Sequence, residues 1–253
     1  MIKASVYIIT LNEEKHIKRT LESVKNFDEI IVVDSGSSDK TLEIASRYTK
    51  NIFYKKWEGE GIQKDYALSL CKNEWVLSLD ADEEVSSSLN NEIKDFINQS
   101  EFVALDIKFL EYYMGVISSD LVKKNTHIRF FKKDYGVYNT KGVHAQINIK
   151  DGNIKKSKFC IHHFSDKFVH DFVIKNNNYS TLRANENKKN GRKFSLLKLI
   201  FIFPLMFFKF YILRRNIFNG IRGFILAVVI AFYAFLKEAK LYELYLKEKV
   251  KSS

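Results

Sequence analysis

The sequence predicts an α/β fold, in which helices cover both faces of a mostly parallel sheet, followed by a helical C-terminal segment. Across the first hundred residues, short continuous apolar runs alternate with segments of helical periodicity. Such runs are typical of parallel strands that are buried on both faces, and their alternation with helices indicates a Rossmann-like layer. From Phe194 onward the chain changes to long apolar runs interrupted by lysine and arginine.

The strands and helices of this layer follow one another along the chain. Asn12 can cap the first helix, in which Ile17, Leu21 and Val24 are spaced four and three residues apart and form one buried stripe. The predicted strands are residues 6–9, 30–33, 52–54 and 75–79, and the predicted helices are residues 13–26, 40–48 and 63–70.

Beyond this layer the periodicity is weaker. Apolar runs at residues 103–109, 127–131 and 145–149 predict antiparallel strands that extend the sheet, and helical periodicity returns over residues 167–184. A polar, lysine-rich connector follows. We therefore divide the chain into a first domain, residues 1–185, and a C-terminal tail, residues 186–253.

Four polar side chains lie at the ends of predicted strands. Thr10 and Asp34 end the first two strands, and Asp80 and Asp82 follow the fourth. Ligands of open α/β sheets bind beyond the carboxyl ends of the strands, so these residues mark the predicted site. Asp34 can accept hydrogen bonds from a ribose or a base, or it can serve only to form a turn.

The two aspartates of the Asp-Ala-Asp segment are separated by one residue. Carboxylates placed in this way on a turn can converge on one hard divalent cation, Mg²⁺ or Mn²⁺, which can bridge the phosphates of a nucleotide. The alternative is a solvated acidic turn that caps the next helix.

The net charge of +11 is carried entirely by the end of the chain. Residues 1–182 contain 26 basic and 26 acidic side chains, whereas residues 183–253 contain 15 basic and 4 acidic ones. The basic residues are interleaved with Phe, Leu and Ile, and no nucleic-acid-binding motif accompanies them, so we exclude nucleic acid as the partner. The pattern indicates an anionic membrane surface.

Two apolar segments make up half of the tail, residues 194–213 and 223–236. A bilayer-spanning helix needs about 20 apolar residues. The first segment is interrupted by two lysines and the second has only 14 residues, so neither is well suited to span a bilayer. We expect peripheral or monotopic helices that lie in the membrane interface. The alternative is a helical pair that packs on the first domain or on another subunit.

The two cysteines, Cys71 and Cys160, fit neither a disulfide framework nor a zinc site. Residues 1–10 lack the pattern of a signal peptide. A reducing cytoplasm is therefore the expected compartment.

Four segments carry motifs in a characteristic order and spacing: IITLNEE at residues 8–14, IVVDSGSSDKT at 31–41, WEG with QK at 57–64, and LSLDADE at 77–83. They resemble the family 2 glycosyltransferases of the GT-A fold. Further segments resemble the branch that adds β-1,4-glucose to the heptose of the lipopolysaccharide inner core. These are RFFK at 129–132, VH at 143–144, HH at 162–163, YSTL at 179–182 and AFLK at 234–237.

The resemblance implies an inverting transfer of glucose from UDP-glucose to the heptose of a lipopolysaccharide or lipooligosaccharide core. The first domain would then be a GT-A nucleotide-sugar-binding and catalytic domain. The tail would hold it peripherally on the cytoplasmic side of the inner membrane, beside a glycolipid acceptor. The implied donor-site residues are Thr10, Glu13 and Asp34 for the uridine, Lys64 for the nucleotide, Asp80 for the sugar, and Asp82 for the metal and diphosphate.

The chain departs from the family pattern at two carboxylates. An inverting enzyme needs a base that takes the proton from the acceptor hydroxyl, and a carboxylate usually serves. The family carries Glu directly after the Val-His pair, where this chain has Ala145, and Asp four residues before Arg129, where it has Asn125. His144 is the candidate base or a metal ligand, although a lone strand histidine is more often a packed, hydrogen-bonded residue.

These departures leave alternatives open. One is a catalytically weak or silent nucleotide-sugar-binding membrane scaffold, and another is the same chemistry with a different donor or glycan acceptor. Lys64 taken alone would be an ordinary exposed helix lysine. Adjacent strand residues point to opposite faces, so we expect His162 and His163 not to bind one ion, and one of them to have a structural or acceptor-side role.

Overall fold

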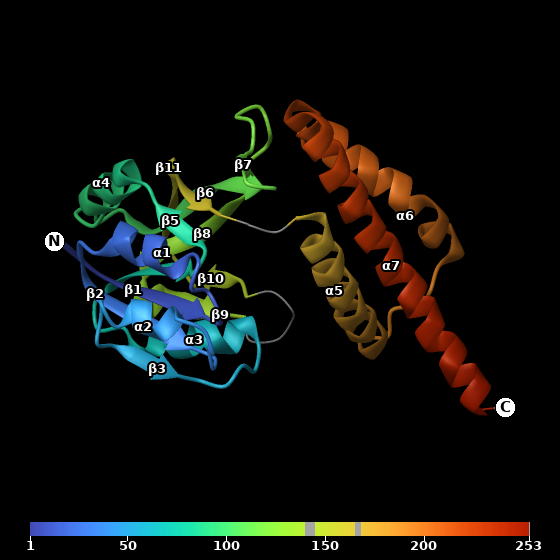
Figure 1. Ribbon diagram of the computed structural model, residues 1–253, viewed down its shortest axis with the longest axis horizontal. Coiled ribbons are helices and arrows are strands. Elements are labelled where there is room, and N and C mark those ends of the chain that lie inside the picture. Colours follow the sequence, from blue (N-terminus) through green and yellow to red (C-terminus); the bar gives the residue numbers. More distant parts are fainter. Residues whose placement is uncertain (140–144, 165–167, 253) are drawn as a thin grey trace. The chain divides into compact units, whose positions relative to one another are not determined.

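The computed structural model describes residues 1–139, 145–164 and 168–252, with side chains as far as residue 250 (Figure 1). The chain divides into two compact units. The sheet unit comprises Met1–Glu111 and Lys124–Phe164, and the helical unit comprises Tyr112–Lys123 and the chain after Phe164.

The central sheet follows the strand order β3-β2-β1-β4-β8-β6-β11-β5, and β7 pairs with the end of β6. Strand β1 is parallel to both β2 and β4, and β2 is parallel to β3. Strand β8 is antiparallel to β4 and β6. The strands are β1 (Ile2–Thr10), β2 (Phe27–Asp34), β3 (Ile52–Tyr54), β4 (Trp75–Asp80), β5 (Glu83–Val85), β6 (Phe102–Tyr113), β7 (Val116–Ile117), β8 (Thr126–Lys132) and β11 (Asn153–His163).

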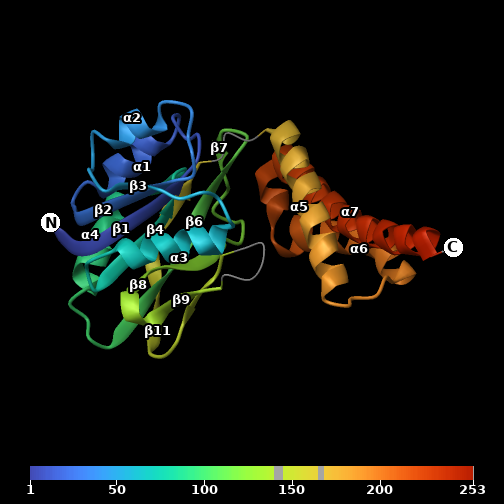
Figure 2. The same ribbon diagram turned by 90° about the horizontal axis from the view of Figure 1, so that it is seen from below.

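Helices cover both faces of this sheet, as the sequence predicts. Helices α1 (Ile17–Val24), α2 (Thr41–Ala45) and α4 (Ser87–Phe96) lie on one face, and α3 (Glu60–Leu70) lies on the other (Figure 2). Alternation along β1 produces the two layers of core. Val6 packs in one cluster with Leu21 and Ile93, whereas Tyr7 packs in the other with Ala67. The predicted α/β fold with a mostly parallel sheet is confirmed.

Several elements differ from the expectation. The first helix begins only at Ile17, because the residues before it form a loop. The apolar run at 145–149 contributes β10 (Ile147–Ile149), which pairs with β9 (Gly136–Tyr138) in a separate two-stranded sheet and does not extend the central one. Strand β11 was not predicted, since its first half is polar and largely exposed.

The helical unit contains α5 (Val169–Lys189), α6 (Leu196–Phe208) and α7 (Gly220–Ser252), with a π-helical turn (Lys209–Leu213) and a 3-10 turn (Asn216–Asn219) between the last two. The predicted boundary between residues 185 and 186 falls inside α5, which packs against α7. The Lys240 ammonium of α7 donates hydrogen bonds to the Asn177 carbonyl and the Ser180 hydroxyl of α5, at 2.7 and 2.8 Å. Helix α5 therefore belongs with the tail.

A buried ion pair joins α7 to the chain before α6. Nη2 of Arg192 lies 2.7 and 2.6 Å from the two carboxylate oxygens of Glu238, which is fully buried. The predicted connector at residues 186–193 is therefore partly the last turn of α5 and partly an anchor for α7.

Two segments of the helical unit are long and apolar enough to cross a membrane, judged by length and composition: Leu196–Leu213 and Asn216–Val250. The first has none of its most apolar 18-residue stretch buried, and the second has 28% buried. Helix α6 thus presents a continuous apolar surface, with six side chains more than half exposed: Leu196, Leu197, Ile200, Phe201, Leu205 and Phe208.

Candidate active site

Thr10 and Asp34 are partners in the β1–β2 register and lie at the carboxyl edge of the sheet. The buried carboxylate of Asp34 accepts hydrogen bonds from the backbone N–H groups of Gly36 and Ser37, at 2.7 and 2.9 Å. Asp34 therefore forms a turn, and this fixes its carboxylate at the sheet edge. The buried Thr10 hydroxyl has no hydrogen-bond partner among the described residues, so it offers a polar contact to a ligand.

Glu13 lies in the loop after β1, and hydrogen bonds join this loop to the one after β2. The Glu13 N–H donates to the Thr41 hydroxyl at 2.8 Å, and the Asn12 N–H donates to the Ser37 hydroxyl at 2.9 Å. Asn12 has a φ of 54°, a left-handed conformation that asparagine tolerates well. Hydrogen bonds therefore brace the loop that carries Glu13 against the loop after Asp34, beside the strand ends that carry Thr10 and Asp34.

Lys64 is a buried lysine, with a side chain only 3% exposed, and not the exposed helix residue of the alternative interpretation. Its Nζ lies 2.8 Å from Glu60 Oε1 and 2.8 Å from Asp80 Oδ1. Burial acts to lower the pKa of Lys64, but the Asp80 carboxylate outweighs it and holds this pKa above its ordinary value. The protein thus fixes a positive charge at the end of β4.

Arg129 of β8 brings a second cation to Asp80. Its Nη2 lies 3.1 Å from Asp80 Oδ2 and 2.7 Å from Glu83 Oε1. Burial acts to raise the pKa of Asp80, yet Lys64 and Arg129 hold it well below its ordinary range. Burial raises the pKa of Glu83 to about 7, against the opposing attraction of Arg129. Asp80 is therefore an ionised carboxylate between two fixed cations.

Asp82 faces His163 at the end of β11. Nε2 of His163 lies 3.3 Å from Asp82 Oδ2, and its Nδ1 lies 2.7 Å from Glu111 Oε2. Burial acts to lower the pKa of His163, but its hydrogen bonds to the two carboxylates raise it to about 11. Strand alternation directs His162 to the face opposite His163, and its ring stacks on Phe164 with the ring centroids 6.2 Å apart.

Asp82 and His163 fit a divalent cation as two protein ligands. Carboxylates suit Mg²⁺ and Mn²⁺, which commonly keep water and substrate phosphates as further ligands, and a neutral imidazole can bind a metal. No group of three or more His, Cys, Asp and Glu side chains is placed to hold a metal ion within residues 1–139, 145–164 and 168–250. A bound phosphate and water are the kinds of ligand that would complete such a site.

Sequence reasoning assigned no role to Glu60, Glu83, Glu111 or Arg129, although all four contact predicted site residues. The signals for them were the RFFK motif that contains Arg129 and the LSLDADE motif that ends at Glu83. His144, the candidate base, lies outside the described residues. In the described part of the chain, Ala145 and Asn125 leave no carboxylate at the two family positions.

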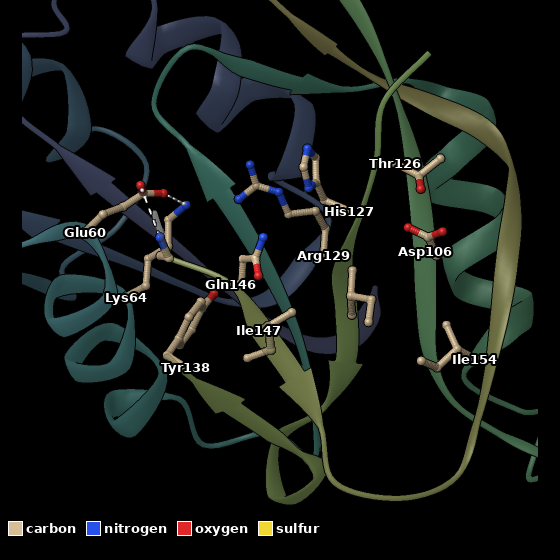
Figure 3. Close-up of a pocket in the computed structure, with 12 residues that line it drawn as sticks. Glu60, Lys64, Asp106, Thr126, His127, Arg129, Tyr138, Gln146, Ile147 and Ile154 are labelled. Atoms are coloured by element: carbon tan, nitrogen blue, oxygen red, sulfur yellow. Dashed lines mark hydrogen bonds and ion pairs between the residues drawn. The ribbon is translucent and has the colours of Figure 1, made fainter. Parts of the chain in front are cut away.

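A pocket of about 690 Å³ lies next to these charges, between β8 and the β9–β10 hairpin (Figure 3). This volume is in the range of small-molecule sites. Figure 3 shows Glu60 and Lys64 at one end, Asp106 and Thr126 at the other, and Arg129 between them. The pocket is therefore continuous with the carboxyl edge that carries Asp80.

Comparison with known proteins identifies the family of this chain. The profile described as glycosyl transferase family 2 matches residues 5–151. An uncharacterized glycosyltransferase of Rickettsia typhi is 37% identical, over 98% of this chain and 90% of its own length. The lipopolysaccharide core biosynthesis glycosyltransferase LpsC of Rhizobium meliloti is 31% identical, over 94% of this chain and 92% of its own length.

Solved structures share the fold at low sequence identity. S. aureus TarS 1–349 in complex with UDP-GlcNAc superimposes with a TM-score of 0.51 and 17% identity, covering 91% of this chain and 90% of TarS 1–349. Glucosyl-3-phosphoglycerate synthase of Mycobacterium tuberculosis, in complex with Mn²⁺, UDP-glucose and phosphoglyceric acid, gives 0.50 and 15%, covering 72% of this chain and 78% of that one. With the family profile spanning more than half of its residues, this chain belongs to glycosyl transferase family 2 and is a glycosyltransferase of the GT-A fold.

Proposed function

We propose that this glycosyltransferase moves glucose from UDP-glucose, with inversion, to the heptose of a lipopolysaccharide or lipooligosaccharide core. The observation that carries the proposal is the cluster at the carboxyl edge of the sheet, where Lys64 and Arg129 flank Asp80 and where Asp82 meets His163. Such a cluster suits a donor that carries both a sugar and a diphosphate. The relationship to LpsC, named for lipopolysaccharide core biosynthesis, supports a core acceptor.

The donor would lie along the edge from β2 to β4. Thr10, Glu13 and Asp34 would hold the uridine. The loops that follow Thr10 and Asp34 are joined by hydrogen bonds, and the buried Thr10 hydroxyl has no hydrogen-bond partner among the described residues. Asp80 would accept hydrogen bonds from the hydroxyls of the sugar, and Lys64 would neutralise charge on the diphosphate. The Lys64 ammonium, already held in place by the protein, would then stabilise the charge that develops on the departing diphosphate.

Asp82 and His163 would hold the divalent cation, Mg²⁺ or Mn²⁺. Such a cation, when bound, neutralises the negative charge of the diphosphate leaving group. His163 can serve only in its neutral form, so cation binding must displace the proton that its two carboxylate partners stabilise. Glu111 would then orient the imidazole through the Nδ1–H.

The helical unit would hold the enzyme peripherally on the cytoplasmic side of the inner membrane, where the glycolipid acceptor is embedded. Within Leu196–Leu213, Lys198 and Lys209 leave only ten uninterrupted apolar residues between them, far fewer than the roughly 20 that a spanning helix needs. A helix of this kind lies more favourably in the interface, with its lysines at the headgroups.

The test compares the surface glycolipid of a strain that lacks this chain with that of strains restored by the wild-type chain, Asp82→Asn or Asp95→Asn. Mass spectrometry should show a core shorter by one hexose in the deleted strain. The wild-type chain should restore it, and Asp82→Asn should fail to do so. Asp95 is an exposed carboxylate of α4 and is the matched control.

A glycolipid of unchanged mass in the deleted strain would contradict the core acceptor. If the purified chain also bound UDP in calorimetry without any turnover of UDP-glucose, the silent scaffold would replace the transferase. Full restoration by Asp82→Asn would contradict the role of Asp82 at the cation.

A further inference from the structure

Three side chains of the types that serve as general bases line the pocket next to Asp80: Glu60, Asp106 and His127. The transfer proposed above requires such a group within hydrogen-bond reach of the acceptor hydroxyl that attacks the donor sugar. The question is therefore which of the three lies at the end of the pocket where the sugar of the donor is held.

Glu60 lies at that end, because it shares an ammonium with Asp80. Nζ of Lys64 is 2.8 Å from Glu60 Oε1 and 2.8 Å from Asp80 Oδ1. A sugar held by Asp80 would therefore lie next to Glu60. Asp106 lies with Thr126 at the opposite end of the pocket, and Arg129 lies between the Glu60–Lys64 pair and His127 (Figure 3).

The two oxygens of Glu60 have different surroundings. Oε1 is held by Lys64, which fixes the orientation of the carboxylate. Oε2 makes one weak contact within the described part of the chain, at 3.5 Å from the N–H of Ala145. Ala145 stands where the family pattern carries a glutamate, so the Glu60 carboxylate lies beside the position from which that carboxylate is missing.

The start of α3 places Glu60 at the pocket. Gly59, the residue before the helix, has φ 128° and ψ 150°, a conformation that is essentially restricted to glycine. The chain turns there, so that Glu60 is the first residue of α3 and Lys64 follows one helical turn later on the same side. The side chain of Glu60 is 27% exposed and remains accessible to a ligand in the pocket.

We infer that Glu60 is the general base of the transfer, an assignment that rests on the proposed function. The acceptor hydroxyl oxygen forms a bond to C1 of the donor sugar, while the bond from C1 to the β-phosphate oxygen breaks and its electron pair leaves with UDP. The hydroxyl proton passes to Oε2 of Glu60 and from there to solvent. Uptake of this proton removes the charge of Glu60 and leaves the Lys64 ammonium to Asp80 and the departing diphosphate.

The experiment measures glucose transfer from UDP-glucose to lipopolysaccharide extracted from the strain that lacks this chain. Glu60→Gln should lower kcat by about 10²–10⁴-fold, because the amide cannot take the proton. UDP affinity in calorimetry should stay within about threefold of wild type. Formate should restore part of the activity of Glu60→Ala by acting as a diffusible base, which a purely structural role of Glu60 would not permit.

The matched control is Glu58→Gln. Glu58 is an exposed carboxylate two residues earlier, paired with Lys55 outside the pocket, and its variant should transfer at the wild-type rate. Asp106→Asn and His127→Asn identify a competing base. Each should lose much less kcat than Glu60→Gln does.

Three results would overturn the assignment. Transfer by Glu60→Gln within threefold of wild type would do so, as would a loss of kcat in Asp106→Asn or His127→Asn that exceeds the loss in Glu60→Gln. Equal losses of transfer and UDP affinity in Glu60→Gln, without formate rescue of Glu60→Ala, would make Glu60 a positioning residue for Lys64. Absence of transfer by the wild-type chain would instead overturn the proposed function, and the assignment with it.

Discussion

Arg129 is the cation that Asp80 and Glu83 share, and its side chain is only 12% exposed. Replacing it by Met would leave two carboxylates in a buried site without this partner. Removal of one member of a buried ion pair typically costs about 3–5 kcal/mol, so we expect Arg129→Met to lose about 3 kcal/mol of unfolding free energy. Urea unfolding can be followed by the fluorescence of Trp75, which stacks at 5.0 Å on the neighbouring Phe130.

The control for this variant is Arg47→Met, because Arg47 and its partner Glu43 are 66% and 59% exposed. An exposed pair of this kind contributes less than about 1 kcal/mol, so the control should keep nearly wild-type stability. Equal stabilities of Arg129→Met and Arg47→Met would contradict the buried cluster.

The pH dependence of the same variant has a defined sign. In the wild-type chain the pKa of Glu83 is about 7, above its ordinary value of 4.5. The folded state therefore holds a proton that the unfolded state has lost, and this contribution to stability declines as the pH rises from 4.5 through 7. Removing Arg129 raises the pKa of Glu83 further. The destabilisation of Arg129→Met should therefore be smaller at pH 5 than at pH 8.

The predicted site residues can be recognised from the local sequence, whereas the missed ones are brought to the site by contacts between distant strands. Asp34, Asp80 and Asp82 could be found because each follows a predicted apolar strand within three residues, and strand ends can be recognised from the local sequence. The partners Arg129 and His163 are 49 and 81 residues away from the aspartates that they contact. Their contacts depend on the strand order β4-β8-β6-β11, which no local pattern encodes.

Helix α3 begins at a glycine whose conformation other residues rarely adopt. A Cβ at Gly59 would meet no atom within 4 Å, so substitution by Ala tests the backbone conformation alone. Residues held in this region cost of order 1–3 kcal/mol, so we expect Gly59→Ala to lose about 2 kcal/mol of unfolding free energy in urea. Because Glu60 follows directly, glucose transfer should fall as well.

Glu58→Ala is the control for that substitution, since it changes the neighbouring loop residue without the special backbone conformation. Only its exposed pair with Lys55 is lost, so its stability should stay close to wild type. A Gly59→Ala chain as stable as Glu58→Ala would show that the start of α3 relaxes without cost.

The longer strands that are buried along most of their length could be predicted from the sequence, whereas the more exposed β11 could not. Strands β1, β2 and β4 are buried almost throughout, and their apolar runs identify them. Strand β11 reads NIKKSKFCIHH and is mostly exposed or half-buried, so it lacks such a run although it occupies an inner position of the sheet. The tail segments were recognised as helical by composition, but the packing of α7 on α5 involves contacts such as that of Lys240 with Ser180, which composition does not reveal.

Over the whole chain, the segregation of charge corresponds to two units with different surfaces. The sheet unit carries the candidate active site, and the whole of the chain's basic excess lies in the helical unit. Each basic residue near an anionic membrane contributes about 1 kcal/mol of attraction, whereas a buried Leu or Phe side chain contributes about 1.5–3 kcal/mol. The apolar side chains of α6 should therefore contribute most of the affinity for a membrane. The arginines should add a smaller contribution that depends on the salt concentration and on the charge of the lipid.

Binding to lipid vesicles separates these two contributions. The triple variant Leu197→Ser, Phe201→Ser, Leu205→Ser replaces side chains that are 70%, 53% and 63% exposed, so it should fold normally. Its binding to phosphatidylglycerol vesicles should fall at least about a hundredfold at every salt concentration. The double variant Arg214→Gln, Arg215→Gln should lose about thirtyfold in binding at low salt, little at 0.5 M salt, and nothing on uncharged phosphatidylcholine vesicles. Leu42→Ser, on α2 of the sheet unit, is the control, and unchanged binding of the triple variant would mean that the α6 face packs on protein and not on lipid.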